Sequence, residues 1–373
     1  MIVFISLFSI IYKNVTKRIF FLFDPETVHE FVTAQGELIG KSKTITNLLS
    51  RYFAKENPIL KQKIAGINFN FPLGLAAGFD YEARLSQILP SLGFGFQTVG
   101  TITNHSYEGN PKPRLGRLPK SKSLMVYKGF KNKGAIWTSE KLEKLSFKNA
   151  LGVSIGKTNT QSKETQKTAI ADILQAFSVF ENSSIKNSYY ELNISCPNLF
   201  GNVSFYPPKN LEELLSAVDN LKIKKPIFIK MPINETDQNV KKMLDVIMKH
   251  KIKGVIFGNL QKDKKNPAIL QEEANKFKHG NFSGLPTQKR SDELIALSHK
   301  HSKKKLVIIG CGGVFSAEDA YRKIKLGASL VQLVTGLVFE GPLLVTKINR
   351  DLIELLENDG YKNISEAVGV ENK

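Results

Sequence analysis

Short apolar runs alternate with helical patterns along the chain from Gly74 onward. The runs cover eight segments, at residues 74–78, 98–102, 150–156, 189–195, 226–232, 254–259, 305–313 and 329–336. Between them, apolar positions recur every three to four residues, for example over 210–222, 235–250, 288–301 and 317–326. Eight successive strand–helix units predict an α/β fold, a (β/α)8 or TIM barrel in one domain.

The chain ahead of this domain begins with two apolar blocks, 1–12 and 19–23, which Lys13, Lys17 and Arg18 separate. Twelve helical residues span about 18 Å, whereas a membrane's hydrocarbon core is about 30 Å thick. The charges also follow the first apolar block, whereas a signal peptide carries them in front. The pattern predicts a helix that lies in the membrane interface, with a core helix as the alternative.

These patterns divide the chain into two parts. We expect residues 1–60 to form a helical, membrane-associating extension and residues 61–373 to form the barrel domain. Within the second part, 61–70 is predicted to be a hairpin that closes the amino-terminal face of the barrel. A long insertion, 104–133, follows the second strand and is rich in Pro and basic residues, and long loops at that face usually carry function.

The charge balance restricts the class of partner. A formal net charge of +19 favours an anionic partner, such as a membrane surface or an acidic ligand. The chain has no aromatic-interleaved basic repeat, so we predict no nucleic-acid partner, and most lysines are interpreted as solvated helix faces. Two cysteines exclude a disulfide scaffold and fit a reducing compartment. We predict no metal site.

The carboxyl ends of the strands hold the active site in such a barrel. One strand ends in Glu-Leu-Asn-Ile-Ser-Cys-Pro-Asn, which places Cys196 between Asn193 and Asn198. A thiol has a reference pKa of about 8.5 that proteins readily tune. The segment therefore predicts a proton-abstracting base between two amides that hold a planar substrate. The alternative is a structural cysteine, because free cysteines are commonly buried.

Other strand ends carry a compatible set of residues. Lys230 closes an apolar strand, where an unpaired ammonium is costly to bury, so it indicates an anionic partner such as a flavin ring. Ala77 and Gly78 leave room for a flat ring. The glycines 312–313 and the segment 334–336 allow a phosphate to approach the backbone. Thr101 and Asn259 also end strands, and turn capping is the alternative for both.

Six motifs together resemble the dihydroorotate dehydrogenase family. They are PLGLAAGFD (72–80), GFGFQTVGTIT (93–103), EGNPKPRLGRLP (108–119), NISCPN (193–198), IIGCGG (308–313) and GASLVQL (327–333). FDPETVHEF (23–31) and the GNPKPR segment are similar to the membrane-associated, quinone-using class. The resemblance implies FMN, dihydroorotate and quinone as partners, and a peripheral position on the cytoplasmic side of the cell membrane.

The resemblance also implies roles for individual residues. Cys196 would be the catalytic base, and His29 and Arg117 would line a quinone tunnel. Substrate would contact Phe130, Asn198 and Asn259. FMN would contact Ala77, Gly78, Tyr81, Thr101, Ser154, Asn193, Lys230, Gly258, Gly284, Gly313, Val334 and Thr335.

Several positions depart from the family's pattern. At the position of Cys196 the quinone class usually has serine, whereas the soluble class has cysteine. At the position of Tyr81 the family usually has lysine. The family's Asn-Arg-Tyr-Gly-Phe is Val-Tyr-Lys-Gly-Phe here (126–130). Ser154 replaces asparagine, Leu260 replaces threonine and Val334 replaces tyrosine.

A lost hydrogen bond to substrate costs about 1–3 kcal/mol, so we expect weaker dihydroorotate binding unless Tyr81, Lys128 or Lys131 compensates. Two other functions stay open. One is an FMN oxidoreductase of the same fold that acts on another cyclic substrate. The other is a flavin-binding membrane protein without turnover, which the joint presence of Asn193, Cys196, Asn198 and Lys230 argues against.

Overall fold

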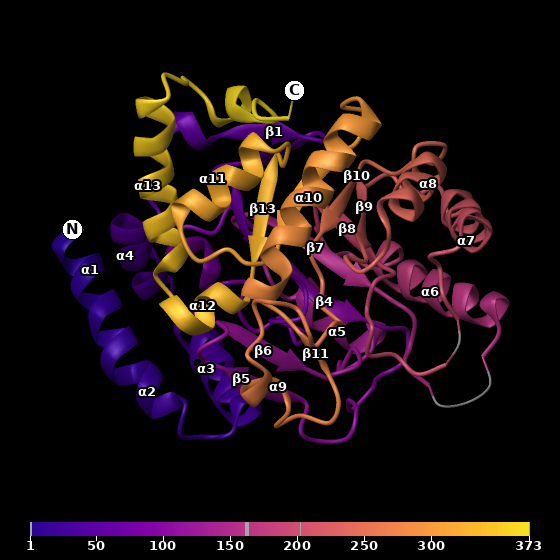
Figure 1. Cartoon of the computed structure of the whole chain (residues 1–373), viewed down its shortest axis with the longest axis horizontal. Coiled ribbons are helices and arrows are strands. Elements are labelled where there is room, and N and C mark those ends of the chain that lie inside the picture. Colours follow the sequence, from indigo (N-terminus) through magenta and orange to yellow (C-terminus); the bar gives the residue numbers. More distant parts are fainter. Residues whose placement is uncertain (1, 161–163, 202, 373) are drawn as a thin grey trace.

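A computed structural model gives the fold and describes residues 2–160, 164–201 and 203–372. Its centre is a closed barrel of eight parallel strands (Figure 1). Around the barrel they are β3 (Leu73–Leu75), β4 (Phe96–Ile102), β7 (Ala150–Ile155), β8 (Tyr189–Asn193), β9 (Ile227–Met231), β10 (Gly254–Phe257), β12 (Val307–Cys311) and β13 (Leu330–Leu333). Spatial order follows chain order, and the predicted TIM barrel is confirmed.

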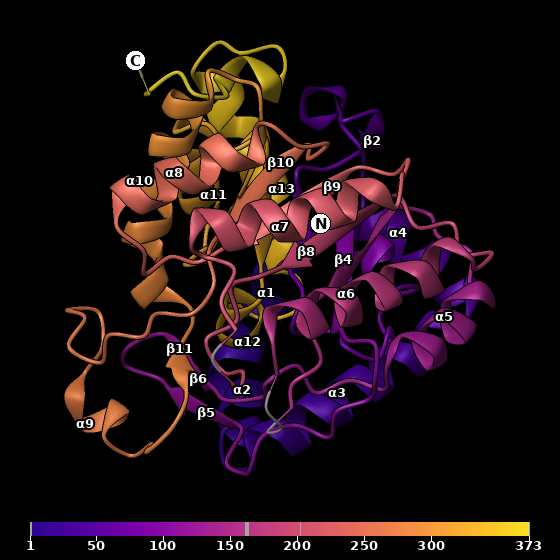
Figure 2. The same cartoon turned by 90° about the vertical axis from the view of Figure 1, so that its right-hand side faces the viewer.

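Helices surround the barrel, as Figure 2 shows from the side. They are α5 (Ala135–Glu143), α6 (Gln166–Glu181), α7 (Pro208–Asn220), α8 (Asp237–Ile247), α10 (Leu285–Ser302), α11 (Ala317–Lys325), α12 (Thr335–Glu340) and α13 (Leu344–Asn358). The first strand-to-strand connection differs, because it carries only a 3-10 helix, Leu89–Leu92. Pro90 lies inside this turn and Gly93 ends it with φ +83°, so the segment does not continue as an α-helix.

Aromatic residues fill the amino-terminal half of the barrel interior. The predicted hairpin is present as β1 (Gln62–Ile64) and β2 (Ile67–Phe69), which pair antiparallel. Its Phe69 packs edge-on against Phe96 at 5.4 Å between ring centroids, and Tyr189 packs against Phe228 at 5.6 Å. All four rings are almost fully buried. Each buried aromatic ring removes a large apolar surface from water. The amino-terminal half of the barrel interior is therefore packed core, and a site can form only at the carboxyl-terminal end.

Four helices precede the barrel: α1 (Ile2–Ile11), α2 (Lys17–Phe20), α3 (Pro25–Gly40) and α4 (Lys43–Phe53), with a π-helical segment, Tyr12–Thr16, between the first two. Asp24 caps α3 by accepting the Thr27 N–H, and Pro25 occupies the first helical position. The π-helical segment reaches α12, where the Tyr12 hydroxyl donates to the Val338 carbonyl at 2.9 Å. Among the residues that the structure describes, no helix is long and apolar enough to cross a membrane.

The insertion after β4 is not only a loop, because part of it folds as a sheet. β5 (Leu115–Leu118) and β6 (Ser123–Val126) pair antiparallel, and β6 also pairs with β11 (Asn281–Phe282) from the loop after β10. Side chains alternate between more and less buried positions along β5 and β6, as expected for a sheet with one covered face. This three-stranded sheet lies at the end of the barrel where the strands' carboxyl ends open (Figure 1, Figure 2).

Candidate functional site

A cavity of about 800 Å³ opens at the carboxyl ends of the barrel strands. It extends from the strand ends past the insertion to α3 and α12, and its volume lies in the range of small-molecule sites. All the site residues predicted from the sequence line it except Ser154: Cys196, Ala77, Gly78, Tyr81, Thr101, Asn193, Lys230, Gly258, Gly284, Gly313, Val334, Thr335, Phe130, Asn198, Asn259, His29 and Arg117. The structure therefore brings together residues from nearly the whole chain.

A chain of side-chain hydrogen bonds crosses the strand ends at the base of this cavity; we call it the strand-end network. Thr101 Oγ1 lies 2.9 Å from Ser154 Oγ and accepts from Asn193 Nδ2 at 2.8 Å. Asn193 Oδ1 accepts from Ser195 Oγ at 3.1 Å, and Ser195 Oγ accepts from Asn259 Nδ2 at 2.5 Å. Ser154 stands behind Thr101, which explains why it supports the cavity without lining it. The network fixes the amides of two asparagines.

Asn198 is fixed by the sheet above the cavity. Its Nδ2 donates to the Val126 carbonyl at 3.0 Å, and its Oδ1 accepts from Asn281 Nδ2 at 2.6 Å. Its backbone carbonyl also accepts from Asn110 Nδ2 at 2.9 Å. An amide nitrogen carries two hydrogens, and among the described residues only the Val126 carbonyl accepts from Asn198 Nδ2, so the second N–H is available to a ligand.

Cys196 lies between these two groups and is only partly accessible, through the cavity. Burial raises the pKa of its thiol to about 12, although the backbone N–H of Asn198 and the charges of Lys157 and Lys262 act in the opposite direction. The thiol is therefore less acidic here than a free cysteine thiol. The physical reason is desolvation, which disfavours the thiolate. At neutral pH the neutral thiol predominates.

Lys230 is a cation at the strand ends that lines the cavity. Its side chain is 4% exposed and stands beside Asn193 and Ile256 in the strand register. The fully buried Glu191 lies on the neighbouring strand, where burial raises its pKa and the Lys230 charge opposes that shift. Glu191 accepts hydrogen bonds from Thr98 and Gln332, each at 2.5 Å.

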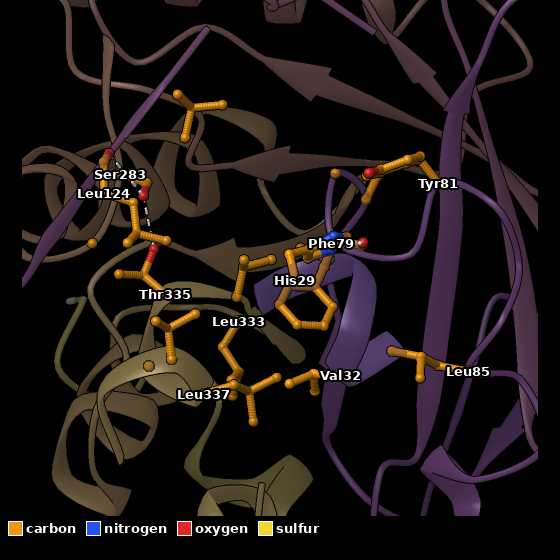
Figure 3. Close-up of a pocket in the computed structure, with 18 of the residues that line it drawn as sticks. His29, Val32, Phe79, Tyr81, Leu85, Leu124, Ser283, Leu333, Thr335 and Leu337 are labelled. Atoms are coloured by element: carbon orange, nitrogen blue, oxygen red, sulfur yellow. Dashed lines mark hydrogen bonds between the residues drawn. The ribbon is translucent and has the colours of Figure 1, made fainter. Parts of the chain in front are cut away.

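Glycines and a hydroxyl pair form the opposite side of the cavity. Gly284 precedes α10 with φ +80°, a conformation that side chains rarely adopt. The neighbouring Ser283 hydroxyl lies 2.8 Å from Thr335 Oγ1, which joins the start of α10 to the start of α12. Backbone N–H groups at the start of a helix favour an anionic ligand. Figure 3 shows Leu124, Ser283 and Thr335 on this side.

An aromatic group faces them across the cavity (Figure 3). His29, from α3, stacks on Tyr81 with ring centroids 5.4 Å apart, and its Nε2 lies 2.7 Å from the Phe79 carbonyl oxygen. Burial lowers the pKa of His29 to about 3, so the imidazole is neutral at physiological pH. Lys128 Nζ donates to the Tyr81 hydroxyl at 3.1 Å and lies 4.2 Å from the centroid of the same ring.

The end of the cavity toward the amino-terminal helices is mainly apolar. Val32, Leu85, Leu333 and Leu337 project into it (Figure 3). Arg117, from β5, borders this end with its guanidinium 4.6 Å from the centroid of Phe21 and donates to the Phe23 carbonyl at 2.7 Å. The cavity is therefore polar at the strand ends and apolar beneath α1 to α3.

Sequence reasoning missed several contacts at the site. Ser195 was not expected in the strand-end network, and Asn110 and Asn281 were not expected to hold Asn198. Lys131 does not extend to a ligand, because it pairs with Glu26 and Glu30 at 3.0 Å each. A signal existed only for Ser195, which sits inside the motif that singled out Cys196. The other contacts join segments far apart in the chain.

Comparisons with known proteins agree with this geometry. The family model described as dihydroorotate dehydrogenase matches residues 59–356. "Dihydroorotate dehydrogenase (quinone)" of Trichodesmium erythraeum is 36% identical over 366 residues, covering 94% of this chain and 95% of the relative. The protein of the same name from Christiangramia forsetii is 36% identical over 348 residues, covering 92% and 99%.

A solved structure gives the same result. The crystal structure of dihydroorotate dehydrogenase from Eimeria tenella in complex with ferulenol superposes with a TM-score of 0.80 at 26% identity, covering 93% of this chain and 96% of that one. The family model and the relatives above 30% identity each span most of the chain. The chain belongs to the dihydroorotate dehydrogenase family.

Proposed function

We propose that this protein oxidises dihydroorotate to orotate and passes the electrons to a quinone. One observation carries the proposal: a single cavity joins a polar network of strand-end amides to an apolar end beneath the amino-terminal helices. A small polar substrate suits the first part and an apolar electron acceptor suits the second. The name shared by the relatives supports the same reaction.

FMN is the proposed cofactor, and the residues at the strand ends fit it. A Cβ added at Gly78 would meet no atom within 4 Å, so the cavity opens directly over this backbone and admits a flat ring. Lys230 would face the ring, while Gly284, Gly313 and Thr335 would surround the phosphate. When bound, FMN supplies the acceptor that takes the hydride from substrate C6 and hands two electrons to the quinone.

The chain's own residues position the substrate and remove a proton. Asn193, Asn198 and Asn259 would hold the amide edges of the pyrimidine, because protein contacts already fix their orientation. Phe130 would cover the ring. Cys196 would act as the base at substrate C5, with the thiolate as the reactive form, and the C5 proton would pass to its sulfur.

The amino-terminal helices would hold the protein peripherally on the cytoplasmic side of a membrane and admit the quinone past His29 and Arg117. Large apolar side chains are exposed along α1 to α4: Leu7, Phe8, Ile10, Ile11, Val15, Ile19, Phe31, Val32, Leu38, Ile39, Ile45, Leu48 and Tyr52. Apolar faces flanked by lysines suit the interface of an anionic bilayer. We retain residues 1–60 as the proposed membrane unit and 61–373 as the barrel domain.

Co-sedimentation with anionic phospholipid vesicles tests this assignment. The full chain should pellet with vesicles, and a chain lacking residues 1–23 should stay in solution while dihydroorotate still reduces its flavin. A truncated protein that pellets equally well would place the anchor elsewhere.

The reaction itself is tested by following orotate formation in purified, FMN-loaded protein with dihydroorotate and a soluble quinone. Orotate formation beyond one equivalent per flavin should require both substrates. Two apolar side chains at the cavity, Val126 and Leu260, favour one other candidate, an FMN oxidoreductase that acts on a different cyclic substrate. That candidate would be favoured if dihydroorotate does not reduce the flavin, while one of a panel of cyclic enones oxidises flavin that has been reduced chemically.

A further inference from the structure

We propose that Lys128 is the cation that receives the carboxylate of dihydroorotate, and that Tyr81 holds its ammonium group in place. The inference rests on the proposed function. It assigns a protein partner to the carboxylate, which is the group that distinguishes this substrate from an uncharged pyrimidine. It makes Lys128 a specificity-determining residue of the site.

The position of Lys128 is unusual for a lysine. It follows β6 in the insertion, is only 7% exposed and lines the cavity. Within the part of the chain that the structure describes, its Nζ makes one hydrogen bond, to the Tyr81 hydroxyl at 3.1 Å, and lies 4.2 Å from the centroid of that ring. An ammonium has three donors, so two N–H groups remain for a ligand.

Among the described residues, the charges of Glu26 and Glu30 favour the ammonium of Lys128, but they act from beyond ion-pair distance. Across residues 2–160, 164–201 and 203–372, no carboxylate oxygen lies within 4.0 Å of Lys128 Nζ. The nearby acids are already engaged: Lys131 Nζ lies 3.0 Å from both Glu26 and Glu30, and Arg114 approaches Glu26 at 3.5 Å. Burial lowers the pKa of Lys128 to about 7. A bound anion would favour the charged form, which this site otherwise disfavours.

The other cations that line the cavity have different surroundings. Arg117 lies at the apolar end, where it donates to the Phe23 carbonyl. Lys131 is held by two carboxylates, and Lys230 stands among the strand ends on β9. The backbone links Lys128 to Asn198 through Asn110, whose N–H donates to the Lys128 carbonyl at 3.2 Å and whose Nδ2 donates to the Asn198 carbonyl at 2.9 Å. We therefore assign Lys128 to the substrate side of the cavity.

The contact between Lys128 and Tyr81 also supplies a test. Because the ammonium lies against the phenol, exchanging the two residue types keeps an ammonium and a phenol together and moves the cation from the insertion to the loop after β3. The exchanged double variant therefore tests whether the cation itself is what the ligand needs.

The experiment measures the dissociation constants of orotate and uracil for the FMN-loaded protein by titration calorimetry. Uracil is orotate without the carboxylate. Lys128→Met should weaken orotate by about tenfold to a hundredfold, the range for hydrogen bonds to charged groups, and should change uracil by less than about twofold. Lys133→Met is the matched control, because this exposed lysine of the same loop carries the same charge. It should change neither constant.

The double variant Tyr81→Lys/Lys128→Tyr should regain most of the orotate affinity that Lys128→Met loses. An unchanged orotate constant in Lys128→Met, or an equal loss for orotate and uracil, would overturn the assignment. Reduction of the wild-type flavin by dihydroorotate distinguishes a failure of the role of Lys128 from a failure of the proposed function. If it occurs while Lys128→Met binds orotate normally, only the role of Lys128 is wrong; if it does not occur, the proposed function fails and the role of Lys128 fails with it.

Discussion

The strand-end network and the insertion side of the cavity meet the same substrate but are built differently. Thr101, Asn193 and Asn259 lie at the ends of barrel strands and are joined by hydrogen bonds through Ser195 and across the strands. On the insertion side, Lys128 follows β6 and meets Tyr81, which comes from the loop after β3. One side is therefore fixed by the barrel strands, and the other is assembled from segments outside the barrel.

The difference follows from how each side is held. Backbone pairing fixes the barrel strands, for example Asn193 opposite Lys230, so a changed side chain at a strand end breaks contacts on both sides. The insertion folds as its own small sheet, and it reaches the cavity with side chains of β5 and β6 and of the segment that follows β6. Lys128 and Tyr81 meet there through their side chains alone, without strand pairing between them. Binding loops on a rigid scaffold commonly tolerate more variation than the scaffold does.

Removal of the base should give the largest effect. Cys196→Ala should slow flavin reduction by dihydroorotate at least about 100-fold, within the range that general base catalysis supplies. Cys196→Ser is the matched variant, because it keeps a proton acceptor of similar size. Its rate of flavin reduction should lie between those of the wild type and Cys196→Ala. Anaerobic stopped-flow absorbance measures all three rates. Equal rates in Cys196→Ala and the wild type would remove Cys196 from the mechanism.

Breaking the strand-end network should weaken ligand binding next most strongly. Asn193→Ala removes the bond to Thr101 and the acceptor of Ser195, and the lost contacts should weaken orotate by about 5- to 150-fold. Ser154→Ala is the control, because Ser154 bonds Thr101 from outside the cavity. Its effect should stay within a few-fold. Equal effects would show that the network supports the fold and not the ligand.

The pH dependence of flavin reduction should identify the titrating group. Burial raises the pKa of Cys196 to about 12, so the thiolate fraction grows about tenfold per pH unit well below that value. The rate at saturating dihydroorotate should therefore rise through the alkaline range without levelling off below about pH 10. Saturation keeps the titration of Lys128, which affects binding, out of the rate. A plateau that begins near neutral pH would contradict this assignment.

The smallest effect is expected for the phenol that holds Lys128. Tyr81→Phe removes one hydrogen bond but keeps the ring under the ammonium, so orotate should bind about two- to tenfold more weakly. Titration calorimetry on the FMN-loaded variant measures the change. A loss as large as that of Lys128→Met would mean that Tyr81 itself contacts the carboxylate.

The sequence predicts the barrel well because its signals are local. Strand and helix periodicity locates all eight strands, and the family motifs mark the residues at their carboxyl ends, which share one cavity. Strand boundaries differ by a few residues; the predicted 74–78 ends at Leu75 in β3, because the small residues that follow turn toward the cavity.

The insertion and the electrostatics of the site could not be predicted in the same way. The pairing of β6 with β11 joins residues more than 150 positions apart, and nothing in either segment specifies the other. The ion pairs of Lys131 with Glu26 and Glu30 depend on contacts that only the folded chain creates. The upward shift of the Cys196 pKa depends on burial in the folded chain.

Anaerobic mixing of the FMN-loaded protein with dihydroorotate tests the central claim most directly, because it isolates substrate oxidation from the quinone. Visible flavin absorbance should bleach in a single phase that saturates with dihydroorotate, and one orotate should form per flavin reduced. A folded, FMN-loaded protein whose flavin stays oxidised at saturating dihydroorotate would contradict the account.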